Sequence, residues 1–316
     1  MLTLLVSRRL PDAVMAEAEA RFSVTCRPVT TPMDHAECVA ALRAHDLILP
    51  TLGDAFRAPA FAEVPEPRAK LLANFGVGYN HIDVAAARAA GLAVTNTPGA
   101  VTDATADIAL TLILMTARRA GEGERMLRAG QWTGWHPTQM LGMHVSGRTI
   151  AIIGMGRIGQ AIARRCHFGF GCKILYANRS PKSVDFPATQ LPMAEALSKA
   201  DIVVLATPGG AETHHLMGAP EFAAMQPHAL FVNISRGDVV DETALIAALA
   251  QNQIAGAGLD VYEFEPRVPQ ALIDMENVTL LPHLGTAALD VREDMGRMAL
   301  ANCIAFAEGR PLPNPV

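Results

Sequence analysis

Short apolar runs rich in β-branched residues alternate with alanine-rich helical patterns along almost the whole chain of 316 residues. Before residue 100 the strand candidates are LTLLV, DLILP, KLLANF and LAVTN, separated by helical patterns at 12–20, 36–44 and 83–90. Near-continuous apolar strands that alternate with helices indicate a parallel sheet covered by helices on both faces. The alternation therefore predicts an α/β fold.

The same alternation starts again near residue 149, with six strand candidates at 149–154, 173–177, 201–206, 229–234, 255–261 and 278–282. Helical patterns at 159–166, 193–200, 220–225 and 242–250 separate the earlier of these strands. Such an inventory is typical of a doubly wound dinucleotide-binding fold. The second half of the chain is therefore predicted to form a domain of this type.

Two long helices are predicted to join the halves of the chain, at about 103–119, with Asp103 available to cap the start, and at about 288–308. A chain of this length exceeds what one ordinary core holds. We therefore expect two doubly wound parallel-sheet domains, with a Rossmann cofactor domain (100–285) inserted into a flavodoxin-like substrate domain (1–99 and 286–316). The last helix is expected to pack on the first domain.

Composition excludes several functional classes. The formal net charge is −5 without a block of like charge, so no basic face for nucleic acid is expected. The longest apolar run, Ile108–Met115, is far shorter than the ~20 residues of a membrane-spanning helix. The five cysteines are scattered and show no metal or redox spacing, which favours buried free thiols. These features predict a soluble cytoplasmic protein without a metal site.

A glycine motif follows the first strand of the second half. IIGMGRIGQA places Gly154, Gly156 and Gly159 between a strand and a helix, the context in which such a motif binds a dinucleotide. Gly154 would form the tight turn, Gly156 would let the backbone approach a pyrophosphate, and Gly159 would let the helix pack on the strand. The helix start attracts phosphates, and Arg157 could add a charge. A turn without a ligand is the alternative.

The stretch LYANRSPK lies where such a domain usually carries an acid for the ribose hydroxyls, about 20 residues beyond Gly159. Asn178 stands at that position and does not repel a 2′-phosphate. Arg179 offers a planar set of donors for phosphate, and Ser180 adds a hydroxyl. Lys182 is a weaker candidate. This pattern favours NADP(H) and leaves NAD(H) as an option, whereas a solvated turn would use the same residues.

Arginine, glutamate and histidine follow three later strands, as Arg236 in NISRGD, Glu263 and Glu265 in YEFEP, and His283 in LLPHLG. The carboxyl ends of such strands face the ligand crevice. Hydride transfer to a ketone needs a proton donor, a cation that orients the substrate, and a group that favours the protonated donor. Histidine, arginine and carboxylate side chains suit these roles.

At this level of detail the sequence resembles the D-isomer-specific 2-hydroxyacid dehydrogenases, and within them the glyoxylate/hydroxypyruvate reductases. The resemblance covers nearly the whole chain. Its motifs are NFGVGYNHID, TDATADIAL, GQWTGWHPTQMLG, GMGRIGQAIARR, VNISRGDVVDE, AGLDVYEFEP and LPHLGT.

The resemblance implies that His283 donates and accepts the proton, that Glu265 is its partner, and that Arg236 clamps the substrate. It implies a substrate loop in which the N–H groups of Val77 and Gly78 hold a carboxylate, with Leu52 nearby. It also implies that Asp260 faces the nicotinamide carboxamide. Together the glycine motif, the turn and the resemblance predict this cofactor-binding set: Thr105, Gly154, Gly156, Arg157, Ile158, Gly159, Asn178, Arg179, Ser180, Thr207, Pro208, Ile234, Asp260, His283 and Gly285.

The remaining expectations concern loops. The tryptophan segment GQWTGWHP resembles an arm that crosses to a partner subunit, which predicts a homodimer and allows Trp135 to reach the partner's substrate site. Glycines in TPGGAETHH predict a mobile loop. His214 and His215, as adjacent residues, are not expected to share a ligand face, and Glu263 is expected to lie in solvent.

The resulting hypothesis is an NADPH-preferring reductase of small 2-oxo acids such as glyoxylate and hydroxypyruvate, giving D-2-hydroxy acids. One alternative is a related NAD-dependent dehydrogenase of a bulkier 2-oxo acid or of another anion such as formate or phosphite. Another is a non-catalytic, dinucleotide-binding corepressor. A turnover assay beside a peptide pull-down separates these classes.

Overall fold

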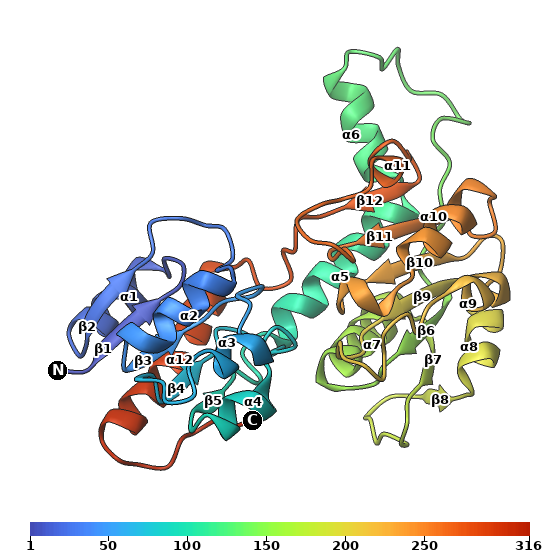
Figure 1. Ribbon diagram of the computed structural model, residues 1–316. Helices are drawn as coiled ribbons and strands as arrows, with labels where there is room; N and C mark the ends of the chain where they lie inside the picture. The colour runs from blue at the N-terminus through green and yellow to red at the C-terminus, as the bar shows by residue number, and fades with distance from the viewer. The chain divides into compact units, whose positions relative to one another are not determined.

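A computed structural model describes residues 1–316, and the chain forms two compact units. The first unit contains residues 1–101 and 286–316, and the second contains residues 102–285 (Figure 1). Each unit is an α/β layer structure built on one parallel sheet, which confirms the predicted fold class.

The sheet of the first unit has five parallel strands in the order β2-β1-β3-β4-β5, the flavodoxin-like arrangement. Its strands are short and its three central ones are almost fully buried, as expected for strands covered on both faces. The strands are β1 (Thr3–Val6), β2 (Ser23–Cys26), β3 (Leu47–Leu49), β4 (Leu71–Ala73) and β5 (Ala93–Thr95).

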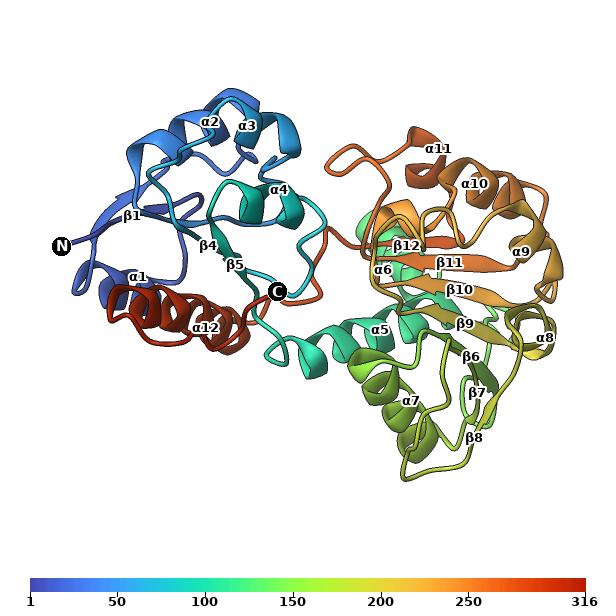
Figure 2. The same ribbon diagram turned by 60° about the horizontal axis from the view of Figure 1, so that its bottom comes forward.

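Helices cover both faces of this first sheet (Figure 2). The last helix of the chain, α12 (Leu289–Ala307), packs against β4 and against α1 (Asp12–Glu19), so it belongs to the first unit as predicted. The opposite face carries α2 (His35–Ala44), α3 (Ala58–Ala62) and α4 (Val84–Ala89), which share one apolar core with the strands. Asp34 begins α2 with a capping box in which its side chain accepts from the Glu37 N–H.

The sheet of the second unit has seven parallel strands in the order β12-β11-β10-β9-β6-β7-β8. The order reverses at β6, and it is there that a doubly wound sheet opens its ligand crevice. The strands are β6 (Thr149–Ile153), β7 (Lys173–Ala177), β8 (Ala188–Gln190), β9 (Ile202–Leu205), β10 (Leu230–Asn233), β11 (Gly256–Leu259) and β12 (Val278–Leu280).

Alternate residues of the central strands enter two separate cores. Ile150 and Ile152 face the core formed with α5 (Thr102–Ala117) and α7 (Arg157–Phe170). Ala151 and Ile153 face the core formed with α8 (Met193–Lys199), α9 (Ala219–Ala224) and α10 (Glu242–Ala250). This double burial explains why the strands read as continuous apolar runs.

Several elements escaped prediction. The edge strands β2 and β8 are three or four residues long and partly polar, so they lack the apolar signal of the inner strands. The helices α6 (Ala120–Arg128) and α11 (Gln270–Ile273) and the short 3-10 turn η1 (Gly237–Val239) were also not predicted. Asp103 does not cap α5, because that helix begins at Thr102 and the Asp103 carboxylate pairs with Arg165 at 2.9 Å.

The structure also bears on the expectations for the cysteines and for a membrane-spanning helix. Four cysteines are buried and unpaired, and Cys26 is partly exposed. Among all the helices, none combines the length and the apolar character that a membrane crossing requires.

Candidate functional site

Two of the three motif glycines are required by the packing of the chain itself. Gly154 has φ +101°, and a Cβ there would lie 2.8 Å from the backbone of Ala206 and Thr207. A Cβ at Gly159 would lie 2.2 Å from the carbonyl oxygen of Gly154. These two positions therefore hold α7 and β9 close to the turn after β6.

The third glycine is not explained by packing. A Cβ at Gly156 would contact nothing within 4 Å, and the residue is exposed at the start of α7. Arg157 beside it is exposed and forms no hydrogen bond or ion pair with the protein. An open backbone at the positive end of a helix, next to an unpaired arginine, suits an anionic ligand such as a pyrophosphate.

A cavity of about 920 Å³ opens next to this turn within the second unit. The ends of β6, β7 and β9 and the loop after β9 form its walls. The hydroxyl of Thr207 is buried at this cavity without a hydrogen-bond partner, and such a group normally finds one. The open glycine and this unpaired hydroxyl fit the dinucleotide that the sequence predicts. Of the predicted cofactor-binding set, these residues line the cavity: Gly154, Asn178, Arg179, Thr207 and Pro208.

The turn after β7 has more partners than its sequence suggested. The Asn178 side chain accepts from the Met155 N–H at 3.1 Å and donates to the Ser180 carbonyl at 2.7 Å, so it ties the turn to the glycine loop. Arg179 forms an ion pair with Glu212 at 2.8 Å, and both side chains are highly exposed. Arg179 is therefore not a free phosphate ligand, because an anion must compete with Glu212 for it.

His283 and Glu265 form a hydrogen-bonded pair at the carboxyl ends of β12 and β11. Nδ1 of His283 lies 2.9 Å from Oε2 of Glu265, and about 30% of each side chain is accessible. The Tyr262 N–H donates to the other oxygen of Glu265 at 3.1 Å and fixes its orientation. With Nδ1 donating to the carboxylate, Nε2 of His283 remains available for a substrate.

The backbone of His283 is strained. Its φ is +54°, a left-handed conformation that is uncommon for a residue other than glycine. Asp260 holds this conformation, because its carboxylate accepts from the N–H groups of Leu284 at 2.6 Å and Gly285 at 2.8 Å, and its carbonyl accepts from the His283 N–H. Strain that is maintained by several contacts is common at functional sites.

This bracing differs from the role expected for Asp260. Both carboxylate oxygens bond to the chain's own amides, so any contact with a nicotinamide would be additional. Burial raises the pKa of Asp260, and the two backbone donors oppose that shift. Thr105, another predicted cofactor residue, donates its hydroxyl to the Gly285 carbonyl at 3.1 Å.

Arg236 lies between β10 and η1 with part of its bonding capacity unused. One terminal nitrogen donates to the Ser235 carbonyl at 2.6 Å, but Nε is buried without an acceptor. Burial lowers the pKa of the Arg236 guanidinium, and the negative charges of Glu265 and Asp238 oppose that shift. A buried guanidinium with an unpaired N–H is prepared to bind an anion or a carbonyl oxygen.

Gly209, in the loop after β9, makes room for this arginine. A Cβ at Gly209 would lie 2.8 Å from Cγ of Arg236. The mobility expected from TPGG stays a prediction.

The surroundings of Glu265 favour its ionised form. Burial alone would raise its pKa, but the hydrogen bond and charge of His283, the Tyr262 N–H and the charge of Arg236 together lower it below the ordinary value of 4.5. A glutamate that remains a carboxylate can keep accepting the Nδ1 proton of His283 throughout a reaction cycle.

Glu265→Gln is expected to lower the free energy of unfolding at neutral pH. The difference between the variant and the wild type should become smaller as the pH falls. A carboxylate with a depressed folded-state pKa contributes stability above its ordinary pKa and loses it as pH falls through the folded value. Calorimetric unfolding of both proteins between about pH 7 and pH 3.5 measures the difference. A Tm difference that is constant or grows toward low pH would contradict this assignment.

In the first unit, the predicted substrate loop follows β4. The Asn74 side chain donates to the carbonyls of Gly76 and Gly78 at 3.0 Å each, and Asn96 donates to the carbonyl of Val77 at 2.9 Å. The N–H groups of Val77 and Gly78 have no acceptor in the protein. Held carbonyls and free adjacent N–H groups form an amide concavity of the kind that binds anions.

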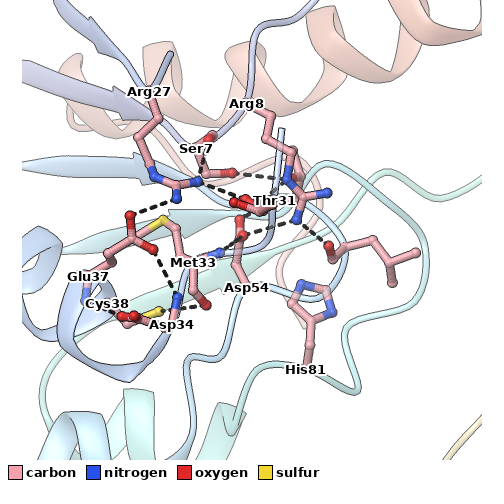
Figure 3. Close-up of polar contacts among 12 residues, drawn as sticks. Ser7, Arg8, Arg27, Thr31, Met33, Asp34, Glu37, Cys38, Asp54 and His81 are labelled. Carbon is pink, nitrogen blue, oxygen red and sulfur yellow. Dashed lines mark hydrogen bonds and ion pairs between the residues drawn. The ribbon is translucent and has the colours of Figure 1, made fainter. Parts of the chain in front are cut away.

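Leu52, the other predicted substrate residue of this unit, belongs to a loop after β3 that is braced by Arg8 and Asp54, whose contact Figure 3 shows. Arg8 donates to its carbonyl at 2.5 Å and pairs with the fully buried Asp54 at 3.1 Å. Asp54 also accepts from the N–H groups of Met33 and Thr51. These contacts fix the backbone at Leu52 through one buried ion pair.

The tryptophan segment lies on the surface of the second unit. The exposed fractions are 51% for Trp132, 79% for Trp135 and 67% for Leu141. The preceding helix α6 has no buried residue, and it projects from the unit (Figure 1). Such apolar exposure is unusual for a surface that remains in water.

Two expectations about histidines and glutamates were wrong. Glu263 does not lie in solvent, since only 12% of its side chain is accessible and it accepts from His215 Nε2 at 2.8 Å. The rings of His214 and His215 stack with centroids 3.9 Å apart, so these adjacent residues do share a face.

Comparison with known proteins adds a family and several relatives. Residues 110–285 match the family described as D-isomer specific 2-hydroxyacid dehydrogenase, NAD binding domain. The chain is 41% identical over 318 residues to glyoxylate reductase of Thermococcus gammatolerans, with 98% of this chain and 94% of the relative covered. It is 38% identical to glyoxylate/hydroxypyruvate reductase B of Cronobacter sakazakii, with 97% and 95% covered.

A solved structure is similar to this chain over its full length. It is an NADPH-dependent glyoxylate/hydroxypyruvate reductase from Sinorhizobium meliloti in complex with NADP and malonate. The TM-score is 0.89 at 34% identity, and 100% of this chain and 96% of that chain are covered.

Proposed function

The chain belongs to the D-isomer-specific 2-hydroxyacid dehydrogenases, enzymes that depend on a nicotinamide dinucleotide, and we propose that it is an NADPH-preferring reductase of small 2-oxo acids. Glyoxylate and hydroxypyruvate are the proposed substrates, and D-2-hydroxy acids are the products. The names of the relatives support this substrate class.

One observation carries the proposal, the hydrogen bond between His283 and Glu265 at the carboxyl edge of the sheet. A pair of this kind provides a proton donor whose orientation and tautomer are fixed by a carboxylate. Arg236 supplies the cation that orients the substrate, and the negative charge of Glu265 favours its protonated form.

Arg236, His283 and Glu265 have separate roles in the proposed reaction. Arg236 binds the substrate through its unused N–H groups and polarises the 2-oxo group. His283 Nε2 donates its proton to the oxygen as negative charge develops there, and Glu265 stays a carboxylate and stabilises the imidazole. The reduced nicotinamide, when bound, supplies the hydride. In the reverse direction His283 accepts the hydroxyl proton.

The first unit is proposed to supply carboxylate recognition. The free N–H groups of Val77 and Gly78 suit the carboxylate that every 2-oxo acid carries. This binding mode uses no side-chain charge, so it leaves the substituent beyond the carbonyl to be selected by other side chains, among them Leu52.

The second unit is proposed to hold the cofactor phosphates. The open backbone at Gly156 and the unpaired Arg157 would bind the pyrophosphate. The turn 178–180 would bind the adenosine ribose, with Asn178 supplying no negative charge and Arg179 and Ser180 supplying donors to a 2′-phosphate. Glu212 would weaken the binding of the 2′-phosphate, because it forms an ion pair with Arg179.

The double change Asn178→Asp with Arg179→Ala is expected to shift the cofactor preference toward NADH. An aspartate repels a 2′-phosphate, and loss of a charge-assisted hydrogen bond costs about 1.5–3 kcal/mol. The ratio of kcat/KM for NADPH to that for NADH should fall by about 10- to 100-fold, measured from initial rates with each cofactor.

Glu212→Gln is expected to have the opposite effect on NADPH binding to that of the double change. It frees Arg179 without altering the turn, so NADPH affinity should rise by up to about fivefold, the limit set by an exposed ion pair. NADH affinity should not change. If the double variant keeps the wild-type ratio, the turn does not read the 2′-phosphate.

We also propose a homodimer in which the segment around Trp132, Trp135 and Leu141 contacts the partner subunit. Light scattering should give the mass of two chains. A variant with Trp132, Trp135 and Leu141 all replaced by serine should shift toward the mass of one chain, because these exposed side chains supply the apolar contact. A wild-type mass of one chain at all concentrations contradicts the dimer.

Product analysis tests the reaction itself. With hydroxypyruvate and NADPH, chiral chromatography should detect D-glycerate. L-glycerate as the main product would overturn the stereochemical part of the proposal. Oxidation of NADPH without formation of glycerate would overturn the assignment of hydroxypyruvate as a substrate.

A further inference from the structure

A second cluster of ionisable side chains lies outside the pair formed by His283 and Glu265. The loop after β9 brings His214 and His215 together, and their rings stack at a centroid distance of 3.9 Å with planes 27° apart. Glu263, in the segment after β11, lies against them. One ligand atom from each of the three residues lies within 4.8 Å of the other two. Nothing in the proposed reduction uses this cluster.

The backbone maintains this arrangement against strain. His215 has φ +51°, and its N–H donates to the Asp238 carbonyl at 2.9 Å, which holds the left-handed conformation in place. Strained positions that neighbouring contacts enforce are concentrated at functional sites. In this conformation the imidazole of His215 lies against the ring of His214, and its Nε2 lies 2.8 Å from Glu263 Oε1.

Glu263 is positioned as well. Its Oε2 accepts from the Glu242 N–H at 3.3 Å, and its own N–H donates to Oε1 of Glu242 at 3.4 Å. The remaining oxygen, Oε1, faces His215 Nε2 at 2.8 Å. The buried side chain of Glu242 therefore holds Glu263 in place beside the two histidines.

Two imidazole nitrogens and one carboxylate oxygen select a particular class of ion. Zn²⁺ and neighbouring divalent transition metals accept this mixture, whereas Mg²⁺ and Ca²⁺ prefer oxygen ligands alone. Zinc–ligand distances of about 2.0–2.1 Å place tetrahedral ligand atoms about 3.3 Å apart. The largest separation exceeds this value by about 1.5 Å, so the exposed ring of His214 has to move by about that distance and turn out of its stack with His215 to ligate the same ion.

We propose that His214, His215 and Glu263 form a binding site for a divalent transition-metal ion, with Zn²⁺ as its representative. Three protein ligands leave one coordination position for water. A bound ion would tether the loop 207–217, which carries Thr207 and Glu212 of the cofactor cavity, to the segment after β11. The site is distinct from the reductase function and does not depend on it.

The test is a Zn²⁺ titration of the full-length, untagged protein, stripped beforehand with a chelator, in competition with a chromophoric chelator. One Zn²⁺ per chain is expected. Because loss of a group that only supports a metal ligand already costs about 10–100-fold in affinity, loss of a ligand should cost at least that much. The variants are Glu263→Gln, His214→Ala and His215→Asn, the last chosen because asparagine tolerates the left-handed backbone of His215.

Two controls separate this site from general surface binding. His228 is an exposed histidine that pairs with Asp201 in the same unit, so His228→Ala should leave Zn²⁺ affinity unchanged. Replacement of Zn²⁺ by Co²⁺ should give a spectrum without thiolate charge-transfer absorption, which excludes binding through the partly exposed Cys26. An unchanged far-ultraviolet circular dichroism spectrum and Tm confirm that each variant is folded.

Failure to bind one ion per chain in the wild type overturns the proposal, as does equal affinity in the wild type and all three ligand variants. Either result leaves the reductase assay unaffected, so the two proposals fail separately.

Discussion

His283→Gln is expected to lower kcat by about 10²–10⁴-fold, the usual contribution of a positioned general acid. Glutamine keeps a side chain of similar reach that can still accept or donate a hydrogen bond, but it cannot transfer a proton at neutral pH. In the proposed mechanism, the bond from His283 Nδ1 to Glu265 and the strained backbone that Asp260 holds together orient Nε2 toward the substrate. Without that imidazole, the oxygen that receives charge must take its proton from water.

Cofactor binding should survive this change, because the cavity and the glycine turn lie on other elements of the unit. NADPH fluorescence titration of the variant checks this point. The matched control is His228→Gln, since His228 also pairs with a carboxylate, that of Asp201, but is remote from the β11 and β12 ends. Turnover near the wild-type value in His283→Gln would show that His283 is not the proton donor.

Arg236→Lys is the second change with a large expected effect. Lysine retains the charge but lacks the planar fork of donors, and removing one member of a buried charged contact typically costs 2–5 kcal/mol. The value of kcat/KM for a 2-oxo acid should fall by about 10²–10³-fold, with a rise in KM as part of the loss. The KM for NADPH should change little.

Arg267→Lys provides the comparison for this arginine. Arg267 is exposed near Glu265 and lies over the ring of Phe264, so it carries the same charge in the same region without being buried. Its replacement should leave kcat/KM within about twofold, as for other exposed charges. Equal and small effects of both changes would remove Arg236 from the substrate site.

Much of the fold could be predicted because the inner strands are buried on both faces. Strands such as Ile202–Leu205 and Leu230–Asn233 are wholly apolar or nearly so, and their order with intervening helices defines a doubly wound sheet. The edge strands Ser23–Cys26 and Ala188–Gln190 have one neighbour each and few buried positions. Their sequences therefore carry little of the signal on which such predictions depend.

The site was predictable where one short segment contains the whole feature. The glycine turn is local, and the structure shows the close packing that requires glycine at Gly154 and Gly159, while the role of Gly156 stays a prediction. The resemblance also selected Glu265 over Glu263 as the partner of His283, and the 2.9 Å contact lies at Glu265. Glu265 and His283 are far apart in the sequence, but their pairing could be predicted because each lies in a recognisable motif.

Contacts between unmarked residues could not be predicted. Glu212 occupies Arg179 although the two lie in different loops, and nothing in NRSP indicates such a partner. The same holds for His215 and Glu263, whose pairing depends on a left-handed residue and on the packing of Glu242. Asp260 was expected at the cofactor, yet its bonds to Leu284 and Gly285 follow from the geometry of one turn. Such side-chain pairings arise from tertiary structure and leave no periodic pattern.

Initial rates of NADPH and NADH oxidation by the purified protein with glyoxylate and with hydroxypyruvate test the central claim most directly. The proposal predicts oxidation of reduced cofactor with both 2-oxo acids, a higher kcat/KM with NADPH than with NADH, and loss of both rates in His283→Gln. Absence of oxidation with either cofactor and either substrate would contradict the proposed function.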